Sequence, residues 1–511
     1  MLRKLTAIFS IVLLILLSAC TEKPNNSSLD NNSSETVSTN VNLQLDEIRP
    51  EGNTSTLRNP QVGGADAEAE TMRNAILNAE DNLKISGVTY YISPSGDDYN
   101  SGTSPEDAWQ TPEAIIINDW NLKDGDGILF ERGGIYRFQG SILLNKELMI
   151  GAYGKGDKPA IYGSSKNYAN NTDWQPSRKK NIWKLSVSCD DIGNIVFNHG
   201  EATGEKKYGG LLDLEKNGDF YHNLDEHYLY LYLDTGYPDE VYKDIEICSR
   251  GNLFMINGKV NNVTIDNLCI KYVGSHGIGT VGNNSNITIT NCEIGWIGGC
   301  QQVNSDEGVR YGNGIQFWSA AYDVRVENNW VYQCYDTGIT FQGRDTEYLN
   351  HVYKNNLMEY NSYNFEFFNA SSTSTATTKG IIKNVVIEDN IMRFAGYGWG
   401  EQRMQPMGVA HITTWGYEYL NENIDQFIFK NNIFDSSARN VIYWAGQEGN
   451  TTKYDGLIIE NNTFYQKINS EGYAMHFRGG PKAGVTASNE SQLITAIKTF
   501  DKNPKSVTVL K

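Results

Sequence analysis

The sequence predicts an all-β solenoid, a parallel β-helix. A segment that alternates apolar and polar residues and then ends at Asn recurs through the C-terminal two thirds of the chain. The repeated Asn residues stand at positions 267, 291, 329, 356, 390, 432 and 462, with unequal gaps. A second short alternating segment follows most of them, as in Gly338-Ile-Thr-Phe341. Fixed motifs separated by variable gaps indicate stacked coils with insertions at the turns.

The alternation and the Asn both favour this fold over other all-β folds. A strand directs every second side chain to one face, so each coil can bury its apolar residues against the coils above and below. Asn side chains can hydrogen-bond from coil to coil, and Asn tolerates the left-handed backbone of a tight turn. A sandwich or a propeller of short strands gives no reason for one Asn at the same point of every unit.

The opening of the predicted domain adds a resemblance to a known class. The motifs are Tyr90-Tyr-Ile-Ser-Pro-Ser-Gly-Asp-Asp98, Asp124-Gly-Asp-Gly-Ile-Leu-Phe130, Gly133-Gly-Ile-Tyr-Arg137 and Ile150-Gly-Ala-Tyr-Gly154. With the repeats, they resemble right-handed parallel β-helix proteins of the pectate-lyase-like (pectin-lyase-like) class. The resemblance implies the fold. It implies no single reaction, because such scaffolds carry lyases, glycosidases, epimerases and binding proteins.

Residues 1–20 are predicted to be a lipoprotein signal peptide. Arg3 and Lys4 precede an apolar run, and Leu17-Ser-Ala-Cys20 resembles a bacterial lipobox. An ordinary signal peptide or a single membrane span are the alternatives, but the run is short for a span. Lipid on Cys20 would tether the protein to a membrane. We expect a bacterial cell-envelope protein, at the outer membrane or cell surface.

The rest of the chain is predicted to form a stalk and one domain. Residues 21–86 begin with an Asn-, Ser- and Thr-rich stretch that we expect to be disordered, with one loose helix within 65–83. The β-helix domain is expected over 87–511. Short helices near 104–117 and 491–500 are predicted to cap its two ends, where unpaired strand edges would be exposed. Strands within 221–233 and 240–248 read as an insertion.

Composition limits the partners. The 511 residues carry a formal net charge of −18, which argues against nucleic acid as a ligand. It also disfavours a polyanionic substrate unless a cation or local Arg residues offset the field. Thirty-nine per cent hydrophobic residues suffice for one large core. We expect a monomer that acts on a polysaccharide.

The cysteines indicate packing more than metal binding. Cys20 is assigned to lipidation, and the other six show no paired metal-ligand spacing. We expect small side chains packed within the coils. Cys300 with Cys334 is the disulfide to test first, because the predicted compartment is oxidising.

Two long insertions indicate where chemistry could lie. Residues 298–313 and 395–408 both interrupt a coil between its first and second segments. They are therefore expected to project from the same side and to form the walls of a cleft. Its floor would be the outward residues of the second segments. If Phe365 and Phe367 point inward, Glu366 points outward. His411 is expected outward on the next coil, about 5 Å from Glu366.

This reasoning gathers acids, Arg residues, one His and aromatic rings in one groove, which suits a carbohydrate. The catalytic candidates are Asp306, Glu307, Asp336, Glu366, Glu401 and His411. The candidate substrate-binding residues are Arg310, Tyr311, Gln316, Trp318, Gln342, Arg344, Trp399 and Arg403. Structural roles compete with each assignment: Glu307 with Arg310 could be a loop ion pair, and Asp336 could be a turn acid.

Three functions remain open from the sequence. A glycosidase needs two carboxyl groups beside the scissile bond. A lyase must neutralise a uronate with Arg310, Arg403 or a calcium ion held by Asp306, Glu307 and Glu366. It must then remove a proton with His411, Tyr311 or an Arg. A non-catalytic glycan-binding protein needs only the groove. The converging acids favour the glycosidase, which requires no cofactor; calcium belongs to the lyase alternative.

Overall fold

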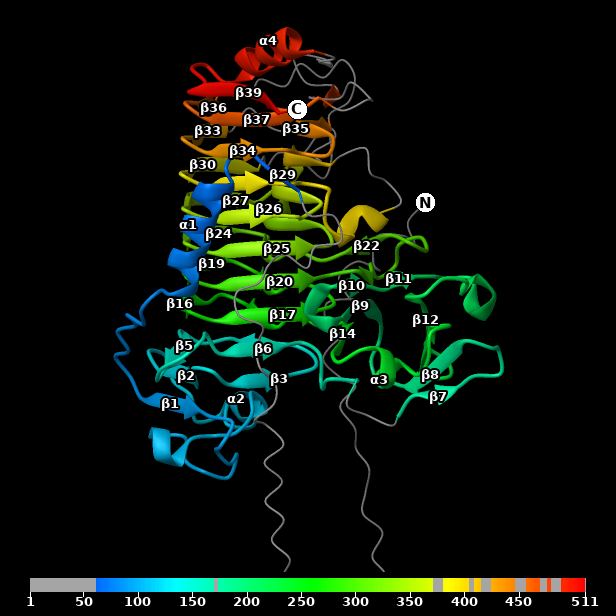
Figure 1. The fold of residues 1–511 in the computed structure, drawn as a ribbon. Helices are drawn as coiled ribbons and strands as arrows, with labels where there is room; N and C mark the ends of the chain where they lie inside the picture. Colours follow the sequence, from blue (N-terminus) through cyan, green and yellow to red (C-terminus); the bar gives the residue numbers. More distant parts are fainter. Residues whose placement is uncertain are drawn as a thin grey trace, which may run out of the picture. The chain divides into compact units, whose positions relative to one another are not determined.

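The computed structural model describes residues 61–169, 173–370, 380–403, 409–414, 424–445, 456–468, 476–478 and 489–510. Three long parallel sheets form the walls of a right-handed β-helix, and the chain passes through them in turn (Figure 1). The predicted fold class is thereby confirmed. The signal peptide, Cys20 and the proposed stalk up to residue 60 lie outside the described residues.

Sheets A, B and C are defined by their strands. Sheet A contains β1 (Thr89–Ile92), β2 (Gly127–Glu131), β5 (Met149–Tyr153), β16 (Asn261–Asp266), β19 (Asn284–Thr290), β24 (Ala321–Glu327), β27 (Glu347–Lys354), β30 (Ile381–Glu388), β33 (Ile424–Lys430) and β36 (Leu457–Glu460). Sheet B contains β3 (Ile135–Arg137), β6 (Ala160–Tyr162), β17 (Cys269–Val273), β20 (Glu293–Ile297), β25 (Trp330–Cys334), β28 (Leu357–Glu359), β31 (Ile391–Arg393), β34 (Ile433–Asp435), β37 (Thr463–Lys467) and β39 (Ser506–Leu510). Sheet C contains β4 (Ile142–Leu144), β15 (Phe254–Asn257), β18 (Ile278–Val281), β23 (Ile315–Trp318), β26 (Thr337–Arg344), β29 (Tyr363–Ala370), β32 (Ala410–Thr414), β35 (Asn440–Ala445) and β38 (His476–Arg478).

Columns of apolar side chains fill the interior. In sheet C, Ile315 pairs with Ile339, which pairs with Phe365 of the next coil. All three are fully buried. Each such side chain contributes roughly 1.5–3 kcal/mol by leaving water. The alternating pattern therefore fixes which face of each strand points inward.

The recurring Asn residues have two different roles at the turn from sheet A to sheet B. The first residue of each pair adopts a positive φ, as in Asn328 (58°) and Asn355 (53°). The second points inward and is bonded to its equivalent in the next coil: Asn356 Nδ2 donates to Asn390 Oδ1 at 2.9 Å. The predicted column is confirmed for the buried residues Asn329, Asn356, Asn390, Asn432 and Asn462, which ends on Asp501. Asn267 and Asn291 instead occupy the positive-φ position.

Helices lie at both ends of the solenoid, as predicted. The 3-10 helix η1 (Pro105–Asp107) and α2 (Glu113–Ile117) lie near the first coils, where Ala114 and Ile115 join the core. Helix α4 (Glu490–Phe500) lies beyond the last coils (Figure 1) and buries Leu493, Ala496 and Ile497. Its side-chain cap is Asn489, which accepts from the Gln492 amide at 3.0 Å.

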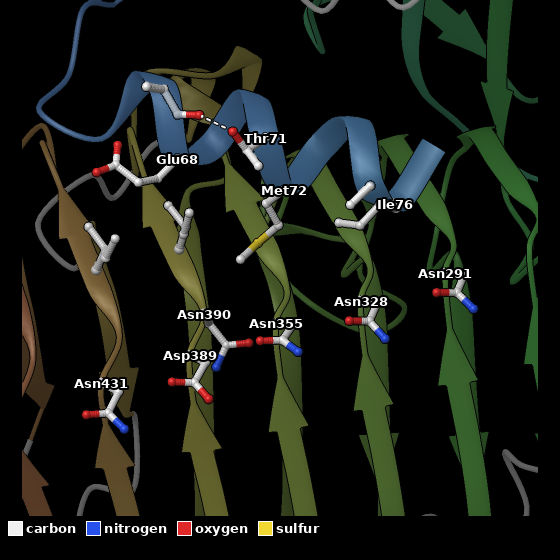
Figure 2. A pocket seen from close by; sticks show the side chains of 14 residues that line it. Glu68, Thr71, Met72, Ile76, Asn291, Asn328, Asn355, Asp389, Asn390 and Asn431 are labelled. Atoms are coloured by element: carbon white, nitrogen blue, oxygen red, sulfur yellow. Dashed lines mark hydrogen bonds between the residues drawn. The ribbon is translucent and has the colours of Figure 1, made fainter. Parts of the chain in front are cut away.

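Helix α1 (Asp66–Leu77) is not the loose helix that the sequence suggested, because it is packed on the outer face of sheet B. Arg73 is buried there, and its Nη2 lies 2.7 Å from Glu359 Oε1. Figure 2 shows α1 lying across the strands, with Met72 and Ile76 pointing toward them. A hollow of about 670 Å³ separates the helix from the turn residues Asn291, Asn328, Asn355, Asp389 and Asn431 (Figure 2).

An insertion between the early and the regular coils carries two smaller sheets. Sheet D contains β7 (Gln175–Pro176), β8 (Ile182–Ser186), β11 (Glu205–Lys206), β12 (Asp219–Asn223) and β13 (Tyr228–Tyr232). Sheet E contains β9 (Ile192–Phe197), β10 (Ala202–Thr203) and β14 (Ile245–Ser249). The short helices η2 (Asn198–Gly200), η3 (Gly210–Asp213) and α3 (Pro238–Val241) belong to the same insertion. The strands expected within 221–233 and 240–248 are present.

The cysteine prediction is corrected by the structure. Cys189, Cys248, Cys269, Cys292, Cys300 and Cys334 are all free thiols, so the proposed Cys300–Cys334 disulfide is absent. The two thiols face opposite sides of the wall: Cys334 belongs to the core, and Cys300 Sγ lies 3.7 Å from the Asp191 carbonyl of the insertion. Among the described helices, none is long and apolar enough to cross a membrane.

Candidate active site

Glu366 lies on the outer face of sheet C, at the centre of β29. Phe365 and Phe367 on either side of it belong to the core, as the alternation predicted. Glu366 pairs with Thr340 of the preceding coil and Thr413 of the following coil. It is nevertheless only 3% exposed. Glu366 thus lies on the outer face of the sheet, but its carboxyl group is screened from water.

Neutral donors surround one oxygen of this carboxyl group. Glu366 Oε2 accepts hydrogen bonds from Thr337 Oγ1 at 3.0 Å and from Gln342 Nε2. Both donors come from β26, one coil earlier. The Thr337 amide is itself held by Asn313 Oδ1 at 2.9 Å. No described Lys or Arg forms an ion pair with Glu366, so hydrogen bonds rather than a cation fix its orientation.

Asp336 is the second carboxyl group of the site, and it has a cation. It precedes β26 by one residue, and its Oδ1 lies 2.6 Å from Arg403 Nη1. The Arg403 guanidinium also lies over the rings of Tyr335 and Tyr363, with 5.5 and 5.3 Å to their centroids. Cation–π contacts of this kind favour a fixed guanidinium. Arg403 is therefore a positioned counter-ion for Asp336.

Burial and mutual repulsion shift the titration of the two acids. Burial, with the nearby Asp336 charge as the next cause, raises the pKa of Glu366 to about 8. Burial also raises the pKa of Asp336, and the Arg403 guanidinium opposes that rise. Two carboxyl groups in one site cannot both ionise easily. Because Asp336 forms the direct ion pair with Arg403, we assign the negative charge to Asp336 and the proton to Glu366.

A protonated and an ionised carboxyl group side by side can perform general acid catalysis. The proton on Glu366 can be given to a leaving oxygen, while the charge on Asp336 can stabilise or activate a group on the reacting carbon. Pairs whose environments drive their pKa values apart are typical of acid–base sites. The arrangement can therefore support cleavage of a bond whose leaving group must take up a proton as it departs.

Two polar and aromatic rows of sheet C lie beside the carboxyl pair. Gln316 pairs with Thr340, and Thr340 pairs with Glu366. In the next row, Trp318 pairs with Gln342, and Gln342 pairs with Phe368. Trp318 is 36% exposed, and its ring meets that of Phe368 edge to face at 6.3 Å between centroids. Gln316, Trp318 and Gln342 therefore lie in the two rows beside the carboxyl pair, and Trp318 is the most exposed of the three.

The two long insertions project from the same side, as predicted, but they pack on each other instead of standing apart. The Arg310 guanidinium lies 4.3 Å from the Tyr335 ring centroid and 5.6 Å from that of Trp399. Arg310 Nη1 donates to Gln402 Oε1 at 3.3 Å. Trp399, in η4 (Trp399–Gln402), is fully buried. Arg310 and Trp399 thus hold the insertions together, so neither is available to a substrate.

In the first insertion, several of the predicted site residues are exposed or bonded to other parts of the chain. It forms a small hairpin of β21 (Cys300–Gln301) and β22 (Arg310–Tyr311). Asp306 and Glu307 are exposed near its tip. Arg310 donates to the carbonyl groups of Gly193 and Gly299, both at 2.6 Å, instead of forming the suggested pair with Glu307. The Tyr311 hydroxyl contacts Arg250 and Ser275.

Three further predicted site residues are exposed to solvent or buried in the protein. Glu401 on η4 and Arg344 at the end of β26 are exposed. The expectation for His411 is wrong, because its side chain is fully buried inside the solenoid. Its Nδ1 lies 3.0 Å from Asn364 Nδ2, and its ring packs on Phe434. Burial lowers the pKa of His411 to about 3, so the ring binds a proton weakly, and its enclosure keeps it from a substrate proton.

Tyr363 is the residue that the sequence analysis missed. It opens β29, is paired with Thr337, and contacts Arg403 beside both carboxyl groups. Burial raises the pKa of its hydroxyl well above the ordinary value. The signal was its position: residue 363 occupies the same place in its coil as Thr337, directly after Asp336. Tracking the coil-to-coil register from Asp336 would have identified it.

The described residues offer no metal centre. Within them, no group of three or more His, Cys, Asp or Glu side chains is arranged to hold a metal ion. Asp306 and Glu307 are exposed on the hairpin, whereas Glu366 is buried beneath Gln342 and Thr337. The trio proposed for calcium is therefore not brought together.

Comparison with known proteins finds similarity to solved structures alone. No family model matches the chain, and no curated protein sequence matches it. A glycoside hydrolase structure is similar with a TM-score of 0.43 and 10% identity, over 83% of this chain and 96% of that one. The endo-xylogalacturonan hydrolase from Aspergillus tubingensis gives 0.38 and 11%, over 80% and 97%. A pectate lyase gives 0.33 and 11%, over 80% of each chain. The fold itself is established by the strand pairing: this chain is a right-handed parallel β-helix of three sheets.

Proposed function

We propose that the protein is an enzyme that cleaves polysaccharide, and that it does so as a glycoside hydrolase. The observation that carries this is the pairing of a buried carboxyl group of raised pKa, Glu366, with an Arg-paired carboxylate, Asp336. Glu366 protonates the glycosidic oxygen as the bond breaks. Asp336 supplies the second carboxyl group, and Trp318 and Gln316 contact the sugar chain on sheet C.

The elimination chemistry of a lyase fits these residues less well. A lyase needs a cation for the uronate carboxylate and a base for the adjacent proton. Arg403 is already neutralised by Asp336 at 2.6 Å. His411 is inside the solenoid, and Arg310 is bound to carbonyl groups of the chain. The proposed hydrolysis needs no cofactor, whereas a lyase outcome would reopen the question of calcium.

The products separate the three functions. We expect incubation with a panel of neutral and uronic polysaccharides to release reducing sugar without new absorbance near the ultraviolet edge. New absorbance from an unsaturated product, abolished by EDTA, would identify a calcium-dependent lyase instead. Binding without any product would identify a glycan-binding protein. Mass spectrometry of the products would give the sugar and the position of the cut.

The pH dependence follows from the titration of Glu366. The general acid acts only when protonated, so kcat/KM should be retained below about pH 8 and lost as the pH rises through that value. A pH–rate profile with a neutral polysaccharide checks this, because a neutral substrate adds no ionisation of its own. An activity that rises through pH 8 would mean that Glu366 acts as a base.

We also propose that the enzyme works outside the cytoplasm, anchored by lipid on Cys20. This rests on the basic start, apolar run and Leu17-Ser-Ala-Cys20 motif of residues 1–20. Such an anchor would hold a monomeric hydrolase at the outer membrane or cell surface. Replacement of Cys20 by Ser should release the protein from the membrane fraction and leave its specific activity unchanged.

A further inference from the structure

Sheet D of the insertion has a hollow outside the carboxyl site. Its volume is about 470 Å³. Its lining residues are Pro176, Ser177, Arg178, Lys184, Gly210, Leu211, Tyr221, Asn223, Glu226, Tyr228 and Tyr230. Three tyrosines, two cations, an amide and one acid line this hollow on a chain with a net charge of −18. The hollow is therefore a candidate binding site with a chemistry of its own.

The local sequence explains why the tyrosines share one face. In Tyr228-Leu-Tyr-Leu-Tyr232, Leu229 and Leu231 are fully buried in the core of the insertion. Period two places Tyr228 and Tyr230 on the opposite face. Tyr221 of β12 lies directly across from Tyr230, and Tyr230 lies across from Lys184 of β8. The antiparallel register thus assembles a continuous patch from three strands.

The side chains in the hollow are oriented by one another. The rings of Tyr221 and Tyr230 are nearly parallel, at 17° and 6.4 Å between centroids. Lys184 Nζ lies 4.6 Å from the ring centroid of Tyr228. The Tyr230 hydroxyl donates to Glu226 at 2.7 Å. Fixed aromatic rings bury large area at a small cost in conformational entropy, which suits a binding surface.

The rim of the hollow is also held in place. Lys179 Nζ donates to the carbonyl group of Leu211 at 2.8 Å, which ties η3 to the strand β7–β8 connection. Arg178, one residue earlier, is exposed at the hollow, and its charge lies near enough to Tyr230 to oppose the rise in that hydroxyl's pKa. Arg178 with Lys184 outweighs Glu226, so the hollow is locally cationic.

We propose that this hollow is a second glycan-binding site that takes a carboxylated oligosaccharide. The C–H faces of sugar rings would pack on Tyr221 and Tyr228, the Asn223 amide would bond a hydroxyl group, and Arg178 would pair with the carboxylate. Binding at the hollow involves no covalent step. The carbohydrate class of the ligand rests on the proposed function, whereas its negative charge rests on the two cations.

The test is calorimetric titration of the full-length protein carrying Glu366→Gln, so that any cleavage of the probe is slow. The probes are a short oligogalacturonate and the same oligosaccharide with its carboxyl groups reduced to alcohols. We expect the double variant Tyr221→Ala/Tyr228→Ala to weaken binding of the oligogalacturonate by about tenfold or more. Arg178→Gln/Lys184→Gln should remove the preference for the acidic probe without removing binding of the neutral one.

Matched controls decide between this hollow and other surfaces. Lys180→Gln changes an exposed cation two residues after Arg178, and Tyr99→Ala removes a fully exposed tyrosine elsewhere; both should bind like the parent. Trp318→Ala removes the ring of the sheet C face, so any binding that is lost in this variant belongs to that face and any binding that remains can be assigned to the hollow. Unchanged binding by both double variants, or equal affinity for the two probes, would overturn the proposal. A wild-type protein that binds but cleaves no glycan would instead overturn the proposed hydrolysis alone.

Discussion

Replacement of Glu366 by Gln is expected to lower kcat by about 10²- to 10⁴-fold, because that is the usual contribution of a positioned general acid. Gln has nearly the same shape as Glu and can still accept from Thr337 Oγ1, which lies 3.0 Å from the carboxyl group. It cannot donate a proton to the leaving oxygen. Substrate binding on the Trp318 row is not altered, so KM should change little. Steady-state kinetics on the natural polysaccharide measure both values.

A substrate with a good leaving group distinguishes an acid from a merely structural residue. A nitrophenyl glycoside of the same sugar needs little protonation, so Glu366→Gln should lose far less activity on it. Glu401→Gln is the matched control, since Glu401 is an exposed acid on the neighbouring η4 and should retain wild-type turnover. Equal losses on both substrates, or a large loss in Glu401→Gln, would contradict the assignment.

The same substitution has an expected effect on stability, and its sign is fixed by linkage. Glu366 has a raised pKa of about 8 in the folded protein, against an ordinary value of 4.5. Between these values the folded state keeps a proton that the unfolded state has lost, so wild-type stability falls as the pH rises. Glu366→Gln removes this dependence. The urea midpoint of Glu366→Gln minus that of the wild type should therefore be larger at alkaline pH than at acidic pH.

Truncation of Arg393 to Ala is expected to be the most destabilising single change in sheet B, at about 3–5 kcal/mol. Arg393 joins three acids beneath α1: Nη1 lies 3.4 Å from Glu359, Nε lies 3.2 Å from Asp435, and Nη2 binds Asp66. Glu359 and Asp435 are at most 2% exposed. Removal of the guanidinium leaves these carboxylates buried with fewer partners, and the cost of an uncompensated buried charge exceeds the lost attraction.

The release of α1 should accompany this loss. Asp435 also accepts from the backbone amides of Gly64 and Ala65, so the network fixes the start of the helix. Arg393→Ala should shift the urea midpoint and speed proteolysis within 61–77. Lys383→Ala is the matched control, because its pair with Asp425 at 3.3 Å is about half exposed on both sides. A shift no larger than that of the control would mean that the network contributes little.

The positions of Glu366 and His411 show how far the alternation could be followed. It predicted Glu366 correctly, because Phe365 and Phe367 leave one residue between two buried rings. It failed for His411, because the pattern is interrupted at the start of the strand. Tyr363 pairs with Ala410 and Phe365 with Ile412, while Asn364 and His411 between them both turn inward and contact each other. The alternation seen from Phe365 and Ile412 onward therefore does not extend back to Asn364 and His411.

Arg310, Trp399 and Arg403 show a different limit. The sequence placed all three in the insertions at one corner and assigned them to the substrate. The structure places Arg310 between the rings of Tyr335 and Trp399, and Arg403 against Asp336. Which cation meets which acid depends on how two insertions fold over the coils. Neither spacing nor residue type encodes that contact.

The sequence by itself determined the solenoid, the inward and outward faces of most strands, and the asparagine turn, because these follow from the two-residue period of a strand and the backbone preference of Asn. Only the tertiary structure decided which acids are buried together, which histidine is enclosed, and that α1 packs on sheet B. The physical reason is that burial and ion pairing arise between residues on different coils, and their proximity depends on the lengths and paths of every turn between them.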